Sequence, residues 1–282
     1  MLTAKWVDYE ILDAGDGEKL ERWGDVVLLR PEPQAIWPKL GNKITPDAHY
    51  IRSSNGGGHW EFARELPQSW QISYGKLKFL VHPTAFKHTG LFPEQSENWD
   101  YMAGLLKKRR GAKVLNLFAY TGGATIACAA AGAFVTHVDS AKGMVARAKE
   151  NAALNGIAQT GVRYLVDDVQ KFVQRERRRG NTYDAIVMDP PSYGRGPGKE
   201  LWKLEQSLVP LINECIQILS PTPLFFVINS YTMGLSPQVI SNLVYLMLQK
   251  RWGGRTFVDY LGLAVGDSPL VLPCGVTGRW EA

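Results

Sequence analysis

Short apolar runs alternate with segments of helical composition through the second part of the chain. The runs, each long enough for a buried strand and too short for a helix, lie at residues 114–118, 134–138, 162–166, 183–188 and 224–228. The helical segments lie at residues 97–108, 124–133, 141–155, 169–179, 201–219 and 237–250. Strands that alternate with helices predict a mostly parallel sheet with helices on both faces. Two final runs, at residues 256–264 and 269–273, predict a closing hairpin that brings an antiparallel strand near the C-terminus.

The first part of the chain has a different pattern. Its short runs of aromatic and β-branched residues are separated by clusters of Gly, Pro, Asn and Asp, which is typical of a mainly β module. These runs lie at residues 9–13, 26–30, 49–52, 59–62, 70–74 and 77–81, and a polar loop follows at 82–95. We therefore expect a small mainly β N-terminal module at residues 1–76, a connecting segment and helix at 77–110, and the main α/β domain at 111–282.

A turn with two glycines joins the first apolar run of the main domain to the next helix. Residues 113–123 read KVLNLFAYTGG. Glycine allows the backbone to approach a ligand closely, and the amides at a helix start favour an anionic group. Asp139 ends the next run, sixteen to seventeen positions beyond the two glycines, where a carboxylate can accept both hydroxyls of a ribose. The turn lacks the Gly-x-Gly-x-x-Gly pattern, so a nicotinamide dinucleotide is the weakest ligand class.

Polar side chains gather where several predicted strands end. They are Asn116, Asp139, Asp167, Asp168, Asp189 and Asn229. A single Asp after a strand is ordinary, because Asp favours turns and helix caps. Three successive strands that end in acid at one edge favour a ligand site, because open α/β sheets bind ligands beyond the carboxyl ends of their strands.

Composition narrows the class of protein. With 282 residues and 45% hydrophobic content, the chain can bury a large core. It has no apolar run of eighteen residues and no secretory signal pattern, so we expect a cytoplasmic protein without a membrane span. The three cysteines, Cys128, Cys215 and Cys274, are far apart. They predict buried thiols and neither a metal site nor a disulfide framework.

The charge is mildly basic and partly clustered. The net charge of +5 permits a polyanionic partner without requiring one. Basic residues form one run at 107–110 and another at Arg175, Arg177, Arg178 and Arg179. Either run is explained by a solvated helix end or by contacts to a polyanion.

These motifs together resemble class I S-adenosylmethionine-dependent methyltransferases, and more narrowly the bacterial group of 23S ribosomal RNA methyltransferases acting on cytosine and guanine. The matching segments are residues 114–123, 138–139, 148–156, 167–169 and 184–191, with 88–95 upstream. The resemblance covers about residues 77–282. It implies a Rossmann-like sheet, S-adenosyl-L-methionine as cofactor and ribosomal RNA as substrate.

The resemblance also implies residue roles. The methionine end of the cofactor would be lined by Asn116, Phe118, Tyr120, Thr121 and Gly122. Asp139 would accept the ribose hydroxyls, beside Ser140. Asp168 and Val169 would meet the adenine, and Asp167 could exchange roles with Asp168. Gln95, from the upstream segment, and Asp189 would complete the cofactor set.

The acceptor side falls at residues 189–193, which read DPPSY. By resemblance, Asp189, Pro190, Pro191 and Ser192 would lie under the transferable methyl group. Two successive prolines fix the backbone there, so that their carbonyls can face a planar base. Tyr193 could stack on that base, and Asn229 would contact the substrate.

Methylation at carbon-5 of a pyrimidine needs a nucleophile, normally a cysteine. The segments after the fourth and fifth strands, residues 189–194 and 228–232, contain no cysteine. We therefore expect methylation at nitrogen. Two alternatives remain open: a methyltransferase for a protein or small molecule, because an Asp-Pro-Pro element also serves amide nitrogens, and a non-catalytic S-adenosylmethionine-binding module.

Overall fold

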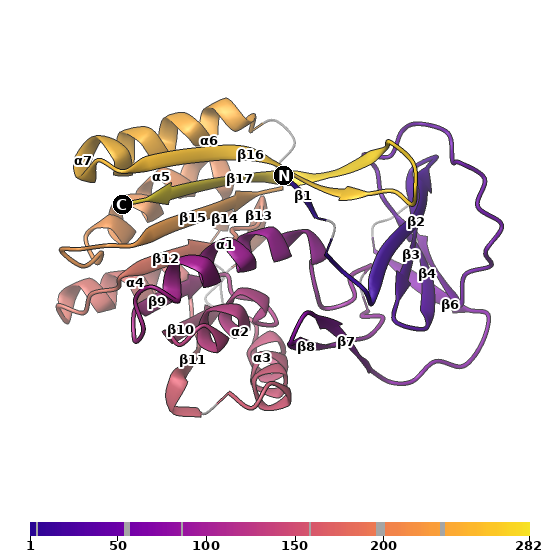
Figure 1. Ribbon diagram of the computed structural model, residues 1–282, viewed down its shortest axis with the longest axis horizontal. Coiled ribbons are helices and arrows are strands. Elements are labelled where there is room, and N and C mark those ends of the chain that lie inside the picture. The colour runs from indigo at the N-terminus through magenta and orange to yellow at the C-terminus, as the bar shows by residue number, and fades with distance from the viewer. Residues whose placement is uncertain (4, 54–56, 86, 158, 196–200, 232–234) are drawn as a thin grey trace. The chain divides into compact units, whose positions relative to one another are not determined.

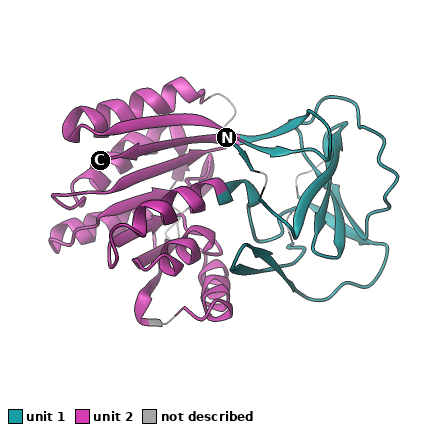
Figure 2. Ribbon diagram, in the orientation of Figure 1, with its two compact units in different colours: residues 1–96, 262–274 teal, residues 97–261, 275–282 magenta. Residues whose placement is uncertain are grey.

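The computed structural model describes residues 1–3, 5–53, 57–85, 87–157, 159–195, 201–231 and 235–282. It divides into two compact units, residues 1–96 with 262–274 and residues 97–261 with 275–282 (Figure 2). The domain boundaries expected at residues 76 and 110 stay a prediction, because a division into compact units does not show which parts of the chain fold separately.

The first unit is rich in β-structure. Its five-stranded sheet has the order β2-β3-β4-β5-β6, with bounds Tyr9–Gly15, Glu18–Trp23, Val26–Pro31, Ala48–Arg52 and Gly58–Phe62. Neighbouring strands are antiparallel except β4 and β5. A separate hairpin joins β7 (Trp70–Tyr74) to β8 (Leu77–Val81). The short helix η1 (Pro93–Gln95) follows. The mainly β character expected here is confirmed.

Strand β3 was not expected from the sequence, because four of its six residues are charged. Glu21 on this strand is fully buried. Its carboxylate accepts hydrogen bonds from Arg30 Nε at 2.6 Å and from the Tyr9 hydroxyl at 2.7 Å. A buried charge is tolerated when it is paired and hydrogen-bonded, so this strand does not need an apolar pattern.

The large sheet has the strand order β1-β16-β17-β15-β12-β9-β10-β11 (Figure 1). The strands are β1 (Leu2–Thr3), β9 (Lys113–Leu117), β10 (Phe134–Asp139), β11 (Val162–Val166), β12 (Ala185–Met188), β15 (Phe225–Ser230), β16 (Arg255–Ala264) and β17 (Val271–Glu281). Strands β9, β10, β11, β12 and β15 are parallel, and β17 is antiparallel to β15. The expected sheet is confirmed.

Helices cover both faces of this sheet. They are α1 (Ser96–Leu106), α2 (Gly123–Ala130), α3 (Lys142–Leu154), α4 (Val169–Arg178), α5 (Leu204–Ile216), α6 (Pro237–Val244) and α7 (Lys250–Trp252), with a short helix at Gln159–Gly161. Leu115 and Leu117 of β9 pack in a hydrophobic cluster with residues of α4, α5 and α6. Asn116 lies between them and bonds Thr125 of α2. Because successive side chains of a strand point to opposite faces, α2 covers the other face.

Two expected helices are corrected. Residues 201–203 are not helical, because Leu201–Lys203 forms strand β14, which pairs antiparallel with β13 (Tyr193–Arg195). Leu204 donates its amide to the Ser192 carbonyl at 3.1 Å, so α5 begins only there. The expected helix at 237–250 is interrupted, because α6 passes into a π-helical turn at Tyr245–Gln249 before α7.

No helix in the described part of the chain is long and apolar enough to cross a membrane. Among the same residues, no group of three or more His, Cys, Asp or Glu side chains is placed to hold a metal ion.

Candidate active site

The loop between β9 and α2 has an unusual backbone. Phe118 and Tyr120 have positive φ angles, 55° and 50°, and Gly122 follows at 89°. Residues other than glycine rarely have positive φ angles, and those that do cluster at ligand sites. Asp16 is the one further non-glycine residue of this kind in the described ranges. The local backbone therefore supports the loop as the centre of a site.

The two glycines of this loop are required by packing. A Cβ on Gly122 would lie 3.0 Å from the Cβ of Ala148 on α3, and a Cβ on Gly123 would lie 2.6 Å from the Trp99 ring on α1. Real Cβ atoms essentially never approach as closely as 2.6 Å, and a contact of 3.0 Å requires the neighbour to move by a few tenths of an ångström. The glycines thus allow α1 and α3 to approach the loop, whereas the sequence had suggested only a close approach of ligand.

Asp139, at the end of β10, is fixed by two backbone amides. Its Oδ2 accepts a hydrogen bond from the Tyr120 amide and its Oδ1 from the Ala141 amide, both at 2.8 Å. Burial raises the pKa of this half-buried carboxyl, and the two amides only partly counter that effect. An ionised carboxylate offers about four acceptor positions. Asp139 can therefore still accept two hydroxyl groups while it holds the loop.

The neighbours Asp167 and Asp168 have different partners. Asp167 forms an ion pair with Arg175 of α4. Asp168 is the N-cap of α4 and accepts a hydrogen bond from the Lys171 amide at 2.9 Å. Val169 is buried as the first residue of α4. Because Asp167 is committed to an ion pair, Asp168 is the better candidate for a polar contact with a ligand.

Asn116 belongs to a buried polar chain under the loop. Its amide nitrogen donates to Thr125 Oγ1 at 2.9 Å, and that hydroxyl lies 2.9 Å from His137 Nδ1. All three side chains are buried. Burial lowers the pKa of His137 to about 3, so this histidine is neutral at pH 7. The geometry gives Asn116 a packing role beneath the loop.

The segment after β12 lies beside the same loop. The Asp189 amide approaches the Leu117 carbonyl at 3.4 Å, Pro190 is buried, and Pro191 and Ser192 are exposed. The Trp202 indole donates to the Pro191 carbonyl at 2.6 Å and packs against Phe118 with ring centroids 5.0 Å apart. Strand β14 thus ties the proline segment to the β9–α2 loop.

The remaining predicted residues are less closely grouped. Tyr193 is 57% exposed, at the start of β13. Asn229 is buried, and its Oδ1 accepts from Asn98 Nδ2 at 3.0 Å. Ser140 is exposed directly after Asp139. Gln95 is buried within the first unit, so its expected contact with the cofactor stays a prediction.

Sequence reasoning missed several residues that support the site. Asn151, fully buried on α3, donates to the Thr121 carbonyl at 2.9 Å. Asn98 on α1 accepts from Thr277 Oγ1 at 3.1 Å and Arg279 Nε at 2.8 Å while it holds Asn229. Asn151 lies within the segment 148–156 that carries the resemblance, but nothing in the sequence indicates its partner.

Comparisons with known proteins identify a family and similar solved structures. A family described as S-adenosylmethionine-dependent methyltransferase matches residues 42–236. The crystal structure of an S-adenosylmethionine-dependent methyltransferase from Agrobacterium tumefaciens has a TM-score of 0.95 and 37% identity, covering 100% of this chain and 92% of that one. A methyltransferase structure in complex with S-adenosylhomocysteine has a TM-score of 0.73 and 21% identity over 98% of this chain and 76% of that one, which supports the fold alone.

Curated proteins that are similar in sequence are named as ribosomal RNA methyltransferases. The ribosomal RNA large subunit methyltransferase K/L of Shewanella baltica is 33% identical over 227 residues, which cover 77% of this chain and 30% of that protein. The ribosomal RNA large subunit methyltransferase I of Aeromonas hydrophila is 33% identical over 128 residues, which cover 45% of this chain and 32% of that protein. The chain thus spans about a third of the length of these relatives.

The match to the family extends over more than half of the chain, and the fold agrees with it. The expected family, fold class and cofactor are confirmed. The chain belongs to the S-adenosylmethionine-dependent methyltransferases.

Proposed function

We propose that this enzyme methylates a base of ribosomal RNA, and that the methyl group is transferred to nitrogen and not to carbon-5. The names of the curated relatives support RNA as the acceptor class. The net charge of +5 is compatible with a polyanionic substrate. A cytoplasmic location, expected from the sequence, is part of this proposal.

The residues at the carboxyl ends of β9, β10 and β11 fit S-adenosylmethionine. Asp139 has acceptor capacity for the ribose hydroxyls, and the positive-φ loop at Phe118 and Tyr120 presents backbone groups to the methionine end, with Thr121 and Gly122. Asp168, which takes part in no ion pair within the described ranges, suits the exocyclic amine of adenine, beside Val169. When bound, the cofactor supplies an electrophilic methyl group on its sulfonium.

On the acceptor side, the residues after β12 would position the base. The Asp189 carboxylate would accept a hydrogen bond from the nitrogen that is methylated, which orients its lone pair. Pro190 and Pro191 fix the backbone, and the Pro191 carbonyl is held by Trp202. Exposed Tyr193 is available to stack on the base. Positioning of this kind can supply a large part of the acceleration of a bimolecular transfer.

The burial of the cysteines is the observation that favours methylation at nitrogen over methylation at carbon-5. Cys128, Cys215 and Cys274 are all buried, and burial raises the pKa of each thiol, to about 12 for Cys128. The thiolate is the nucleophilic form, so none of the three is prepared to attack a pyrimidine ring. Methylation at nitrogen needs no such attack.

A labelled-methyl assay tests the proposal. The purified protein is incubated with S-adenosylmethionine carrying a tritiated methyl group and, separately, with total ribosomal RNA or total protein from cells that lack the enzyme. We expect label in RNA and none in protein, with Asp189→Ala as the inactive control. Label in protein alone would favour the alternative acceptor class.

A further inference from the structure

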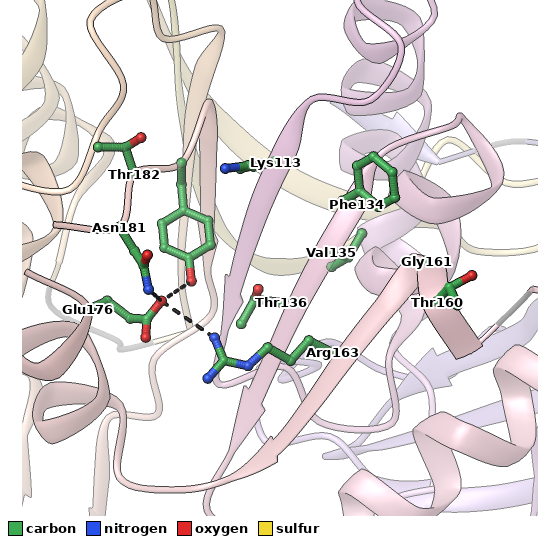
Figure 3. A pocket seen from close by; sticks show the side chains of 11 residues that line it. Lys113, Phe134, Val135, Thr136, Thr160, Gly161, Arg163, Glu176, Asn181 and Thr182 are labelled. Carbon is green, nitrogen blue, oxygen red and sulfur yellow. Dashed lines mark hydrogen bonds and ion pairs between the residues drawn. The ribbon is translucent and has the colours of Figure 1, made fainter. Parts of the chain in front are cut away.

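A pocket of about 250 Å³ lies at the end of the sheet opposite to the candidate active site. Its lining includes Lys113, Phe134 and Thr136 from the first residues of β9 and β10, and Arg163 from the start of β11 (Figure 3). The candidate site occupies the carboxyl ends of the same parallel strands. The pocket is therefore a separate feature, and the residues proposed for the cofactor do not explain it.

The floor of this pocket is polar and internally satisfied. Glu176 of α4 is fully buried. Its carboxylate accepts hydrogen bonds from the Tyr183 hydroxyl at 2.7 Å and Asn181 Nδ2 at 2.9 Å, and Arg163 lies 3.5 Å away. Although burial raises the pKa of Glu176, these donors outweigh it and lower the pKa overall. The negative charge is thus compensated within the protein, and the floor does not select a cation.

Lys113 lines the pocket, and the basic run at residues 107–110 precedes it in the sequence. Lys107, Lys108 and Arg110 precede β9, and their side chains are exposed, as is that of Lys113. Within the described ranges, none of these four side chains takes part in an ion pair. Arg109 differs, because it is bound to Asp184 and to the Thr222 carbonyl. The basic run thus contains one structural arginine and three exposed cations.

Most arginines of the second basic run, at residues 175–179, form ion pairs within the protein. Arg175 pairs with Asp167, Arg177 with Glu214 and Arg179 with Glu176. Most of its charge is used within the protein. The first run is therefore the better candidate for an external anion.

An exposed aromatic ring lies beside the first run. Phe134 is 56% exposed at the start of β10. Hydrogen bonds from the Gly111 amide to the Gly132 carbonyl and from the Phe134 amide to the Ala112 carbonyl, both 2.9 Å, join the two segments. Aromatic rings beside a positively charged groove are the combination by which proteins bind single-stranded nucleic acid.

We propose that the amino-edge surface, comprising Lys107, Lys108, Arg110, Lys113 and Phe134, binds a single-stranded segment of RNA. One unstacked base lies in the pocket against Phe134, while the three lysines and Arg110 contact the adjoining phosphates. The volume is below the roughly 300–1,000 Å³ of sites for drug-sized ligands, which suits one base better than a larger molecule. The inference rests on RNA being the acceptor and adds a second contact, away from the base that is methylated.

Binding of fluorescein-labelled oligouridylate and oligoadenylate, each twelve nucleotides long, tests this surface by fluorescence anisotropy. Loss of one stacked base, in Phe134→Ala, should weaken binding roughly 5- to 150-fold. The double variant Lys108→Ala/Arg110→Ala should reduce the slope of log affinity against log salt by roughly 1.4. Matched controls are Phe62→Ala, a 55% exposed Phe on β6, and Lys76→Ala/Lys250→Ala, two exposed lysines outside this surface. Both controls should bind as the wild type does.

Affinity for S-adenosylhomocysteine, measured by calorimetry, should be unchanged in all variants and shows that they are folded. If the wild type methylates RNA and the variants Phe134→Ala and Phe62→Ala bind RNA with equal affinity, the proposed surface is overturned and the proposed acceptor stays intact. Absence of RNA methylation would overturn the acceptor assignment and this inference with it. Tighter binding of a labelled polyglutamate peptide than of RNA, with the same pattern among variants, would assign the surface to a protein partner.

Discussion

The side-chain amide of Asn151 donates a hydrogen bond of 2.9 Å to the backbone carbonyl of Thr121. Helix α3 thereby holds the β9–α2 loop in a conformation that its φ angles make unfavourable on their own. Asp139 holds the same loop from β10, through the Tyr120 amide. The loop is therefore fixed from two sides before any ligand binds.

Replacement of Asn151 should loosen the loop. Asn151→Ala leaves the Thr121 carbonyl without this donor, at a cost of about 1–3 kcal/mol in the free energy of unfolding. Affinity for S-adenosylhomocysteine should also fall, because part of the binding energy must then order the loop. Asn155→Ala is the matched control, since Asn155 donates to the Asn151 carbonyl within α3. Thermal unfolding and calorimetry measure the two effects, and equal ligand affinity in both variants would refute the positioning role.

Asp139 should make cofactor affinity dependent on pH. The ionised carboxylate accepts the ribose hydroxyls, so affinity is present above the pKa of Asp139 and is lost as the pH falls through it. Because burial raises this pKa, the loss should begin at a higher pH than for an ordinary Asp. Calorimetry with S-adenosylhomocysteine over a pH series measures how the affinity depends on pH. Affinity that is constant, or that increases on acidification, would contradict the ribose assignment.

Asp139→Ala should weaken cofactor binding at every pH. It removes two charge-assisted hydrogen bonds to the ribose, each worth about 1.5–3 kcal/mol. Ser140→Ala, next to it and exposed, is the control and should have a much smaller effect. Unchanged affinity in Asp139→Ala would remove the residue from the site.

Asp189→Ala should abolish methyl transfer and leave cofactor affinity within about tenfold, because we place Asp189 on the acceptor side, where its main task is to orient the base. Single-turnover rates and calorimetry separate the two effects. A variant that fails to bind cofactor but transfers normally at saturation would place Asp189 on the cofactor side instead.

The three cysteines should be dispensable for turnover. Each can be changed to alanine, singly and together, at a stability cost on the order of 1 kcal/mol per site from the small cavity left behind. Activity per folded molecule should persist. A covalent adduct with RNA containing 5-fluoropyrimidine that disappears in one of these variants would establish a nucleophilic cysteine and carbon-5 chemistry.

Most strands of the large sheet could be predicted because apolar runs of the right length are bounded by turn residues. The run at residues 162–166 coincides with β11 of this sheet, and outside it the run at 70–74 coincides with β7. Strand β3 could not be predicted in this way, because its buried Glu21 is compensated by Arg30 and Tyr9, which lie elsewhere in the sequence. The hairpin of β13 and β14 was also missed, because its pairing depends on tertiary contacts of Trp202.

The positions of the candidate site at strand ends follow from topology and were predictable. The partners of its side chains were not. Sequence could not choose between Asp167 and Asp168, whereas the ion pair to Arg175 distinguishes them. Nor could it show that Asn116 bonds Thr125 beneath the loop, because that contact depends on how α2 packs on the sheet.

The identity of the methylated nucleoside tests the central claim most directly. Ribosomal RNA from cells lacking the enzyme is incubated with the purified protein and S-adenosylmethionine, digested to nucleosides and analysed by mass spectrometry against synthetic standards, with Asp189→Ala in parallel. Our account predicts one nucleoside methylated at a nitrogen of its base, present with the wild type and absent with the variant. A 5-methylpyrimidine nucleoside, or RNA that stays unmodified while protein becomes methylated, would contradict it.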